Sequence, residues 1–260
     1  MPSGMESKRE VVGLVPAAGA AERISPLPCS KEIFPIGFHI DRNTCARRPK
    51  AAAHYLLENM QNAGAEKAFI VIRKGKWDIP AYFSGEGIDC IPLAFIPLNA
   101  TTSVPFTIDQ AFPFLKNSMI LFGFPDILST PTTSFGDLIG VQQTSDADIV
   151  LGLYKADRPE KMDMLEMDAD NRIRKIHIKP SETLLCYTWI MAVWTPRFSL
   201  FLHHFLKQSS FTSHKELYLG DVIQAAIEDD LSVDTHIFHT GKYIDIGTPE
   251  DLQKAVGTWR

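Results

Sequence analysis

The chain carries near its start the stretch Gly13-Leu14-Val15-Pro16-Ala17-Ala18-Gly19-Ala20-Ala21-Glu22-Arg23-Ile24-Ser25-Pro26, followed by Ser30-Lys31-Glu32-Ile33-Phe34-Pro35-Ile36-Gly37. The apolar beginning of this stretch predicts a buried strand. The small residues after it let backbone N–H groups approach a phosphate chain closely. Arg23 and Lys31 would supply positive charge to the same anion. The stretch therefore predicts a phosphate-binding loop at the end of the first strand.

Outward from this loop, the chain alternates apolar runs with helical patterns. We expect strands at residues 11–15, 68–72, 118–122 and 149–153, and helices at 49–63, 103–115 and 135–143, with Pro49 in the first turn of its helix and Gly64 just past its end. Such alternation predicts a largely parallel sheet covered on both faces.

Short strands then follow one another, at residues 164–167, 172–178 and 187–193, with a tight turn at 168–171; they predict an antiparallel layer. The remaining expectations are helices at 198–207 and 215–228, a strand at 232–239, and a last helix that begins at Pro249 with Thr248 as its cap. Ser213 and Glu216 have the spacing of a capping box. Residues 37–48 read as a long polar loop. We predict a flexible N-terminus over residues 1–10 and one domain over 11–260.

Composition restricts the function classes. The 260 residues are 45% hydrophobic and 22% charged, with a net charge of −5, so no basic excess points to nucleic acid. The four widely spaced cysteines form no C-x-x-C pair, which favours reduced thiols over zinc or a disulfide framework. The first ten residues lack an apolar signal region, and no run approaches 18 apolar residues. We expect a cytoplasmic protein that does not bind a membrane.

Three later blocks join the first loop: Leu121-Phe122-Gly123-Phe124-Pro125-Asp126, Arg172-Ile173-Arg174-Lys175-Ile176-His177-Ile178-Lys179-Pro180 and Tyr243-Ile244-Asp245-Ile246-Gly247-Thr248-Pro249-Glu250-Asp251-Leu252. In this order, the four blocks resemble the sugar-1-phosphate nucleotidyltransferases, most of all the short glucose-1-phosphate thymidylyltransferases and uridylyltransferases. The resemblance implies a Rossmann-like α/β fold, with a mixed, mostly parallel sheet, helices on both faces and a small antiparallel addition.

The resemblance also implies roles for individual residues. Asp126 and Asp245 each end an apolar strand-like run, where open α/β sheets place ligands, and two carboxylates suffice for Mg²⁺. Lys31 is expected at the α-phosphate and the leaving pyrophosphate, Arg23 at the β- and γ-phosphates, and Lys179 at the sugar phosphate. Substrate-binding backbone is expected from the first loop and from the segment near the third strand: Ala17, Ala18, Gly19, Ala20, Ala21 and Ser103.

Several positions depart from the family pattern. Ala21 replaces a glycine, although an alanine is unfavourable where φ must be positive. Glu22 replaces a threonine, and its carboxylate would repel a triphosphate unless it faces outward. Pro125 stands in place of a glycine before Asp126, and Ile178 in place of a glutamate before Lys179. These changes keep open a divergent substrate or a catalytically silent homologue.

The reading that the sequence favours is an Mg²⁺-dependent enzyme that joins a sugar 1-phosphate to a nucleoside triphosphate (glucose 1-phosphate with dTTP or UTP, by resemblance) and releases pyrophosphate. Two alternatives stay open: a cytidylyltransferase that acts on a non-sugar phosphate, and a silent homologue that binds a sugar nucleotide. The sequence does not choose the base, the sugar or the oligomeric state, and a homo-oligomer is one option.

Overall fold

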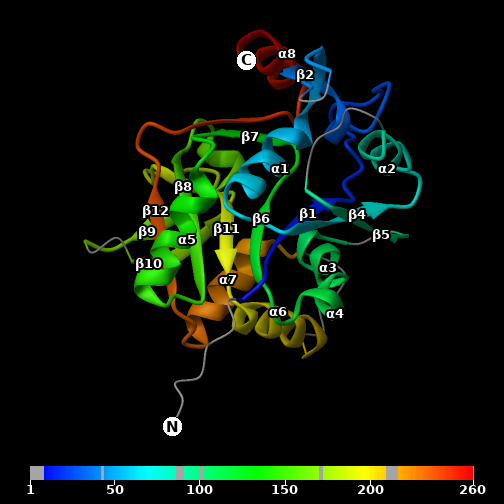
Figure 1. Ribbon diagram of the computed structural model, residues 1–260. Helices are drawn as coiled ribbons and strands as arrows, with labels where there is room; N and C mark the ends of the chain where they lie inside the picture. Colours follow the sequence, from blue (N-terminus) through cyan, green and yellow to red (C-terminus); the bar gives the residue numbers. More distant parts are fainter. Residues whose placement is uncertain are drawn as a thin grey trace.

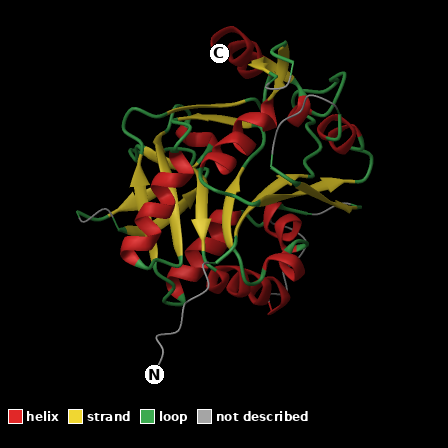
Figure 2. Cartoon of the chain, in the orientation of Figure 1, coloured by secondary structure: helices red, strands yellow, loops and turns green. Residues whose placement is uncertain are grey.

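The computed structural model describes residues 9–41, 44–85, 91–99, 102–169, 172–208 and 216–259. Within these ranges, one central sheet of nine strands is flanked by helices on both faces (Figures 1 and 2). Its strands are β1 (Val11–Ala17), β4 (Lys67–Arg73), β5 (Leu93–Leu98), β6 (Met119–Gly123), β8 (Ile149–Lys155), β9 (Asp163–Met167), β10 (Ile173–Ile178), β11 (Tyr187–Trp194) and β12 (Val233–Ile237). No helix in the described part is long and apolar enough to cross a membrane.

The sheet has a parallel and an antiparallel part, as the sequence predicts. The strands run in the order β10-β9-β11-β6-β1-β4-β5, and β8 lies between β11 and β12. β6, β1, β4 and β5 are parallel to one another, as β12 is to β8. β11 pairs in the antiparallel sense with β6, β8 and β9. The carboxyl ends of β1 and β6 therefore open at the same edge of the sheet.

Two hydrophobic clusters cover the two faces, and β1 shows why. Val12 and Leu14 belong to one cluster, whereas Val15 and Ala17 belong to the other, because successive side chains of a strand point to opposite faces. The first cluster includes residues of α3 (Val104–Asp109), α4 (Phe112–Leu115), α6 (Pro196–Gln208) and α7 (Leu219–Glu228). The second includes residues of α1 (Ala52–Asn62), α2 (Asp78–Phe83) and α5 (Ser134–Ser145).

Two small antiparallel ribbons lie outside the main sheet. One pairs β2 (Pro35–Ile40) with β3 (Arg47–Ala51), and the other pairs β7 (Ile127–Thr130) with β13 (Lys242–Asp245). A third cluster of buried residues joins both ribbons to α1 and α8 (Pro249–Thr258); its members are Ile36, Ala52, Leu128, Ile246 and Ala255. The short 3-10 turns η1 (Lys31–Ile33) and η2 (Pro159–Lys161) complete the described elements.

The region around Pro49 differs from the expectation. Pro49 lies in strand β3, opposite Phe38, and the helix begins at Ala52, whose N–H donates to Phe34 O (3.0 Å). A proline is tolerated here because the two-stranded ribbon leaves one edge of β3 unpaired. The predicted loop 37–48 is therefore largely a hairpin, of which residues 42–43 lie outside the described ranges. Gly64 follows the helix with a φ of +85°, as expected of a residue just past a helix end.

Two other predicted helices are shorter than expected. Residues 103–115 form two separate helices, α3 and α4, because Pro113 has no N–H with which to continue the first. The helix predicted from 215 begins at Leu219, after Tyr218, whose backbone N–H donates to the Asp221 carboxylate (2.8 Å). Ser213 and Lys215, and residues 170–171 of the predicted turn, lie outside the described ranges. The cap of α8 is confirmed, because Thr248 Oγ1 accepts a hydrogen bond from Asp251 N (3.2 Å).

Candidate active site

The β7–β13 ribbon brings together two carboxylates that are far apart in the sequence. Asp126 lies in the turn between β6 and β7, and Asp245 is the last residue of β13. Their strands are in antiparallel register, with Asp245 opposite Ile127. Ile246 N donates to Asp126 O (3.0 Å), which closes the end of the ribbon. Both predicted metal ligands therefore lie at one point, beyond the carboxyl end of β6.

Lys31 also reaches this point, from η1. Its ammonium forms an ion pair with the Asp126 carboxylate, and both side chains are largely buried. Burial alone would lower the pKa of Lys31, but the Asp126 charge outweighs it and raises that pKa. Burial would likewise raise the pKa of Asp126, and the Lys31 ammonium lowers it instead. The lysine is thus held in its protonated form, as a cation that must neutralise phosphate requires.

Asp245 has a different electrostatic environment. Burial, together with repulsion from Asp126, raises its pKa to about 6, although Lys31 and Arg23 partly offset the shift. Its Oδ1 is buried and has no hydrogen-bond partner within the described residues. Such an orphaned oxygen has a large desolvation cost, which a bound cation would remove.

Gly247 lets Arg23 approach this carboxylate. A Cβ placed on Gly247 would lie 2.9 Å from Arg23 Nη2 and 3.1 Å from Asp245 Oδ1. The first distance is shorter than Cβ atoms show in real structures. The absence of a side chain at Gly247 thus leaves room for the arginine and the Asp245 carboxylate to lie against the backbone. Arg23 itself is exposed and lines the cleft described below.

The segment that carries Lys31 is anchored from behind. Glu32 is 1% exposed and pairs with the buried Lys76, with 2.6 Å between Oε1 and Nζ. Burial raises the pKa of Glu32, and the Lys76 ammonium opposes this rise. Ser30 donates to the Asp78 carboxylate through both its backbone N–H (2.6 Å) and its hydroxyl (2.8 Å). These contacts fix the backbone on both sides of Lys31, so that its position is set before any ligand binds.

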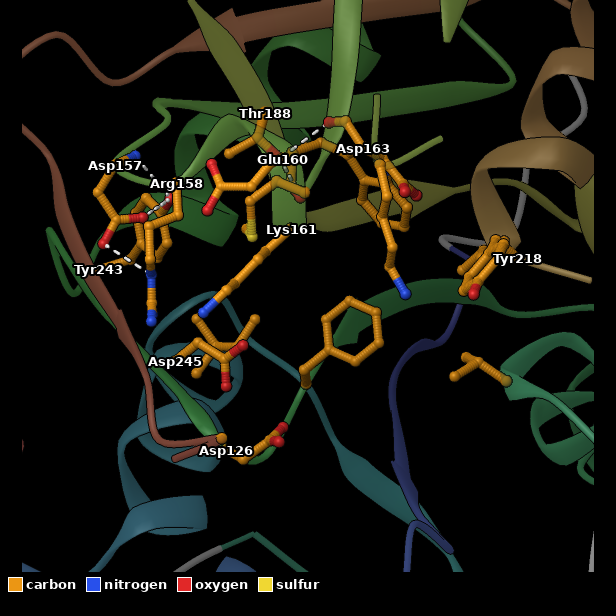
Figure 3. Close-up of a pocket in the computed structure, with 18 of the residues that line it drawn as sticks. Asp126, Asp157, Arg158, Glu160, Lys161, Asp163, Thr188, Tyr218, Tyr243 and Asp245 are labelled. Carbon is orange, nitrogen blue, oxygen red and sulfur yellow. Dashed lines mark hydrogen bonds and ion pairs between the residues drawn. The ribbon is translucent and has the colours of Figure 1, made fainter. Parts of the chain in front are cut away.

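A cleft of about 470 Å³ opens beside the two aspartates. Four predicted site residues line it, namely Arg23, Asp126, Lys179 and Asp245, and Lys31 contacts it through Asp126. Figure 3 shows Asp126 and Asp245 close together, with Asp163 and Tyr218 farther along the cleft. The five predicted backbone positions Ala17, Ala18, Gly19, Ala20 and Ala21, and also Ser103, are not among the residues that line it.

The first loop nevertheless follows β1 directly. Ala21 has a φ of +56°, in the left-handed region that favours glycine, as expected where it replaces the family's glycine. Its carbonyl accepts hydrogen bonds from Ile24 N (3.2 Å) and Ser25 N (3.1 Å). A Cβ on Gly19 would meet no atom within 4 Å, so the loop leaves open space there. Glu22 is exposed and does not line the cleft, which agrees with an outward orientation.

Ser103 precedes α3 and is buried. Its Oγ has no hydrogen-bond partner in the described part of the chain, whereas its carbonyl accepts from Thr107 N (3.1 Å). Ser103 itself does not line the cleft, and its buried hydroxyl has no partner among the described residues to explain it.

Sequence reasoning missed the charged residues that follow β8. Arg158 Nη1 pairs with Asp251 Oδ2 (2.9 Å), which also accepts from Thr248 Oγ1 (2.7 Å). Lys161 has no ion pair within the described residues, and Figure 3 shows it reaching toward Asp245. The charged run from Asp157 to Lys161, just past a predicted strand, was the available signal.

The donor set fits a magnesium ion held partly by its substrates. Among the described residues, no group of three or more histidine, cysteine or carboxylate side chains is placed to hold a metal. Asp126 and Asp245 alone offer two carboxylates, one with an unpartnered buried oxygen. Mg²⁺ accepts this arrangement, because it commonly takes one or two carboxylates and completes its shell with water and phosphate oxygens.

Comparisons with known proteins agree with this architecture. No protein-family model matches the chain. A curated relative, the low-salt glycan biosynthesis nucleotidyltransferase Agl11 of Haloferax volcanii, is 21% identical over 94% of the chain. The chain spans 64% of the length of that relative.

Two solved structures share the fold. One is described as a glucose-1-phosphate thymidylyltransferase from Bacillus anthracis in complex with a sucrose; it has a TM-score of 0.79 at 15% identity and covers 95% of this chain and 94% of its own. The other is a UDP-glucose pyrophosphorylase complexed with UDP-glucose, with a TM-score of 0.80 at 17% identity over 96% of this chain and 98% of its own. Over nearly its whole length, the chain therefore has the fold of the sugar-1-phosphate nucleotidyltransferases, the family that its four sequence blocks resemble.

Proposed function

We propose that this protein transfers a nucleotidyl group from a nucleoside triphosphate to a sugar 1-phosphate and releases pyrophosphate. The observation that carries the proposal is the convergence of Asp126, Asp245, Lys31 and Arg23 at the carboxyl ends of β1 and β6. The functions named for the relatives support it, as does the order of the four sequence blocks.

The reaction requires a cationic site that holds two anions together. An oxygen of the sugar phosphate attacks the α-phosphorus, and the bond between the α-phosphorus and the bridging oxygen of pyrophosphate breaks. No covalent enzyme intermediate is needed, so catalysis consists of positioning and of neutralising the developing charge. When bound at Asp126 and Asp245, Mg²⁺ would supply charge neutralisation at the phosphate oxygens.

The protein's own cations have separate tasks in this proposal. Lys31, kept protonated by Asp126, moves its ammonium from that carboxylate to the α-phosphate and the leaving group. Arg23, held against Gly247, binds the outer phosphates. Lys161 lines the cleft, has no carboxylate partner among the described residues, and adds a cation that can bind phosphate. Lys179, at the far side, binds the acceptor phosphate.

The test is product formation. The purified protein would be incubated with Mg²⁺, each common nucleoside triphosphate and a panel of sugar 1-phosphates, with chromatography for nucleotide sugars and an enzyme-coupled assay for pyrophosphate. We expect both products from at least one pair. Asp126→Asn should lose at least 100-fold in kcat, and Asp137→Asn, an exposed aspartate of α5, should not change it.

The alternatives give different results. Turnover of CTP with phosphocholine, and of no sugar phosphate, would support the cytidylyltransferase alternative. Tight binding of a sugar nucleotide without turnover of any pair would support the silent homologue.

A further inference from the structure

The far side of the cleft holds Lys179, which the proposed function assigns to the acceptor phosphate, together with four side chains that have no role in that function. We define the acceptor wall as Asp163, Lys179, Trp189, Glu216 and Tyr218, all of which line the cleft. They come from the start of β9, the end of β10, β11 and the segment before α7. Figure 3 shows Asp163 and Tyr218 away from the Asp126–Asp245 pair. The wall therefore faces the part of the acceptor that lies beyond its phosphate.

Asp163 is a half-buried carboxylate without a partner. Within the described residues, the Asp163 carboxylate accepts no hydrogen bond and forms no ion pair. Its backbone carbonyl accepts a hydrogen bond from Thr188 Oγ1 (2.9 Å). Its Oδ2 lies against α7, 2.7 Å from where a Cβ on Gly220 would be. Burial raises the pKa of Asp163 to about 6, and the Lys179 charge offsets only part of the rise. No described residue therefore forms an ion pair that would compensate this charge.

Trp189 presents the complementary gap. Its side chain is packed near Phe124 (6.2 Å between ring centroids), and the residue is 5% exposed. Its indole Nε1 is buried and has no hydrogen-bond partner among the described residues. A buried N–H normally finds an acceptor, from protein, water or ligand. The acceptor wall thus lacks both a cationic or donor group for Asp163 and an oxygen for Trp189.

The wall already holds one ammonium. Lys179 Nζ lies 4.0 Å above the ring of Tyr218, whose hydroxyl donates to Glu216 (2.8 Å). An aromatic face beside carboxylates attracts cations through the ring quadrupole and the negative charge. When Lys179 turns to an acceptor phosphate, its ammonium moves away from the Tyr218 ring, and Asp163 loses the positive charge that partly offsets its own.

We propose that the acceptor is a sugar 1-phosphate that carries a protonated amine, with its phosphate on Lys179, its ammonium on Asp163 and a hydroxyl oxygen on the Trp189 indole. This inference rests on the proposed function. A neutral sugar would give Asp163 a hydroxyl donor but no opposite charge, whereas a zwitterionic acceptor brings both charges that the wall needs. A non-sugar amine phosphate would leave the indole N–H unpaired.

Binding without catalysis tests the inference. Calorimetry would compare glucosamine 1-phosphate, glucose 1-phosphate and phosphoethanolamine on the wild-type protein at pH 7.5, above the pKa of Asp163. We expect glucosamine 1-phosphate to bind at least tenfold more tightly than the other two. Asp163→Asn should remove that preference and change the affinity for glucose 1-phosphate by less than threefold. Glu166 is an exposed carboxylate on the same strand, so Glu166→Gln is the matched control. It should change neither the preference nor the affinity for glucose 1-phosphate.

Each of the other possible results refutes one part of the inference. Equal binding of the two sugar phosphates, or a preference that survives Asp163→Asn, refutes the amine contact. Tighter binding of phosphoethanolamine than of glucosamine 1-phosphate refutes the claim that the acceptor is a sugar. Turnover assays then separate this inference from the function beneath it. If only neutral sugar phosphates gave a nucleotide sugar, the amine contact would be refuted and the proposed nucleotidyltransferase function would stand. If binding depended on the amine but no nucleoside triphosphate were turned over, the role of the acceptor wall would stand and the proposed reaction would be refuted.

Discussion

Replacing Asp245 with asparagine should stabilise the metal-free protein while abolishing its response to magnesium. The reason is the environment of the carboxylate, which is partly buried, close to Asp126 and without a partner on Oδ1. Asparagine keeps the shape of the side chain and removes its charge. The substitution thus separates two roles that are usually lost together: ligand of a cation, and unfavourable charge in the absence of that cation.

The size of the effect follows from the pKa of Asp245, which is raised from an ordinary 3.8 to about 6 in the folded protein. Two pKa units correspond to about 3 kcal/mol between the protonated and ionised forms. Because the residue is partly open to solvent, we discount this to ~1–2 kcal/mol. A chain of this size shifts its Tm by roughly 2–4 °C per kcal/mol, so we expect a gain of ~2–8 °C at pH 7.5.

The pH dependence fixes the sign. Since the folded pKa lies above the unfolded one, the ionised carboxylate destabilises the fold, and this penalty grows as the pH rises from about 4 to about 6. The Tm of Asp245→Asn should therefore equal that of the wild type at pH 4 and be higher at pH 7.5. Differential scanning calorimetry across this range, with and without MgCl₂, measures both points. Magnesium should raise the Tm of the wild type and not that of the variant.

Two results would refute this reasoning. A Tm difference that is the same at pH 4 and pH 7.5 would show that the charge of Asp245 is not the cause. A magnesium-dependent rise in the variant equal to that of the wild type would remove Asp245 from the cation site. Asp137→Asn, with its exposed carboxylate, controls for loss of charge elsewhere and should show neither effect.

Three further predictions concern the charged residues in and around the site. Lys31→Ala should lower kcat, whereas Lys179→Ala should raise KM for the acceptor more than for the nucleoside triphosphate; steady-state kinetics with both substrates would contradict this division if the two variants behaved alike. Glu22→Thr should change triphosphate affinity by less than about threefold, because Glu22 is exposed, and a tenfold gain by calorimetry would show that it obstructs the site. Lys76→Met should destabilise the protein by ~3–5 kcal/mol by leaving Glu32 buried and unpaired, and adding Glu32→Gln should recover much of this loss in urea unfolding.

Local signals in the sequence predicted most elements of the central sheet. β4, β6, β8 and β11 were expected from apolar runs and lie within two residues of the predicted bounds. Helix ends were predicted where a glycine or a cap marks them, as at Gly64 and Thr248. The start of α1 was wrong, because Pro49 satisfies the rule for a first helical turn and the rule for an edge strand equally well.

The candidate site was predictable only in part. Asp126 and Asp245 could be named from their blocks, but their meeting depends on the pairing of β7 with β13, two four-residue strands without a clear apolar alternation. Arg158 and Lys161 belong to a short charged run of the kind that usually lies on a solvated surface. The unpartnered state of Asp163 and of the Trp189 indole is a tertiary property, and no spacing in the sequence carries it.

The β7–β13 ribbon also sets the order in which the site is completed during folding. Asp126 belongs to the half of the chain that builds the parallel strands β1, β4, β5 and β6, whereas Asp245 lies on β13, which closes a large loop by pairing with β7 residues at least 112 positions earlier in the chain. Closing such a loop has an entropic cost that local contacts cannot offset until the sheet exists. A partly folded chain would thus hold the Lys31–Asp126 ion pair before Asp245 joins it, and the pair of carboxylates that can hold a cation would be completed last.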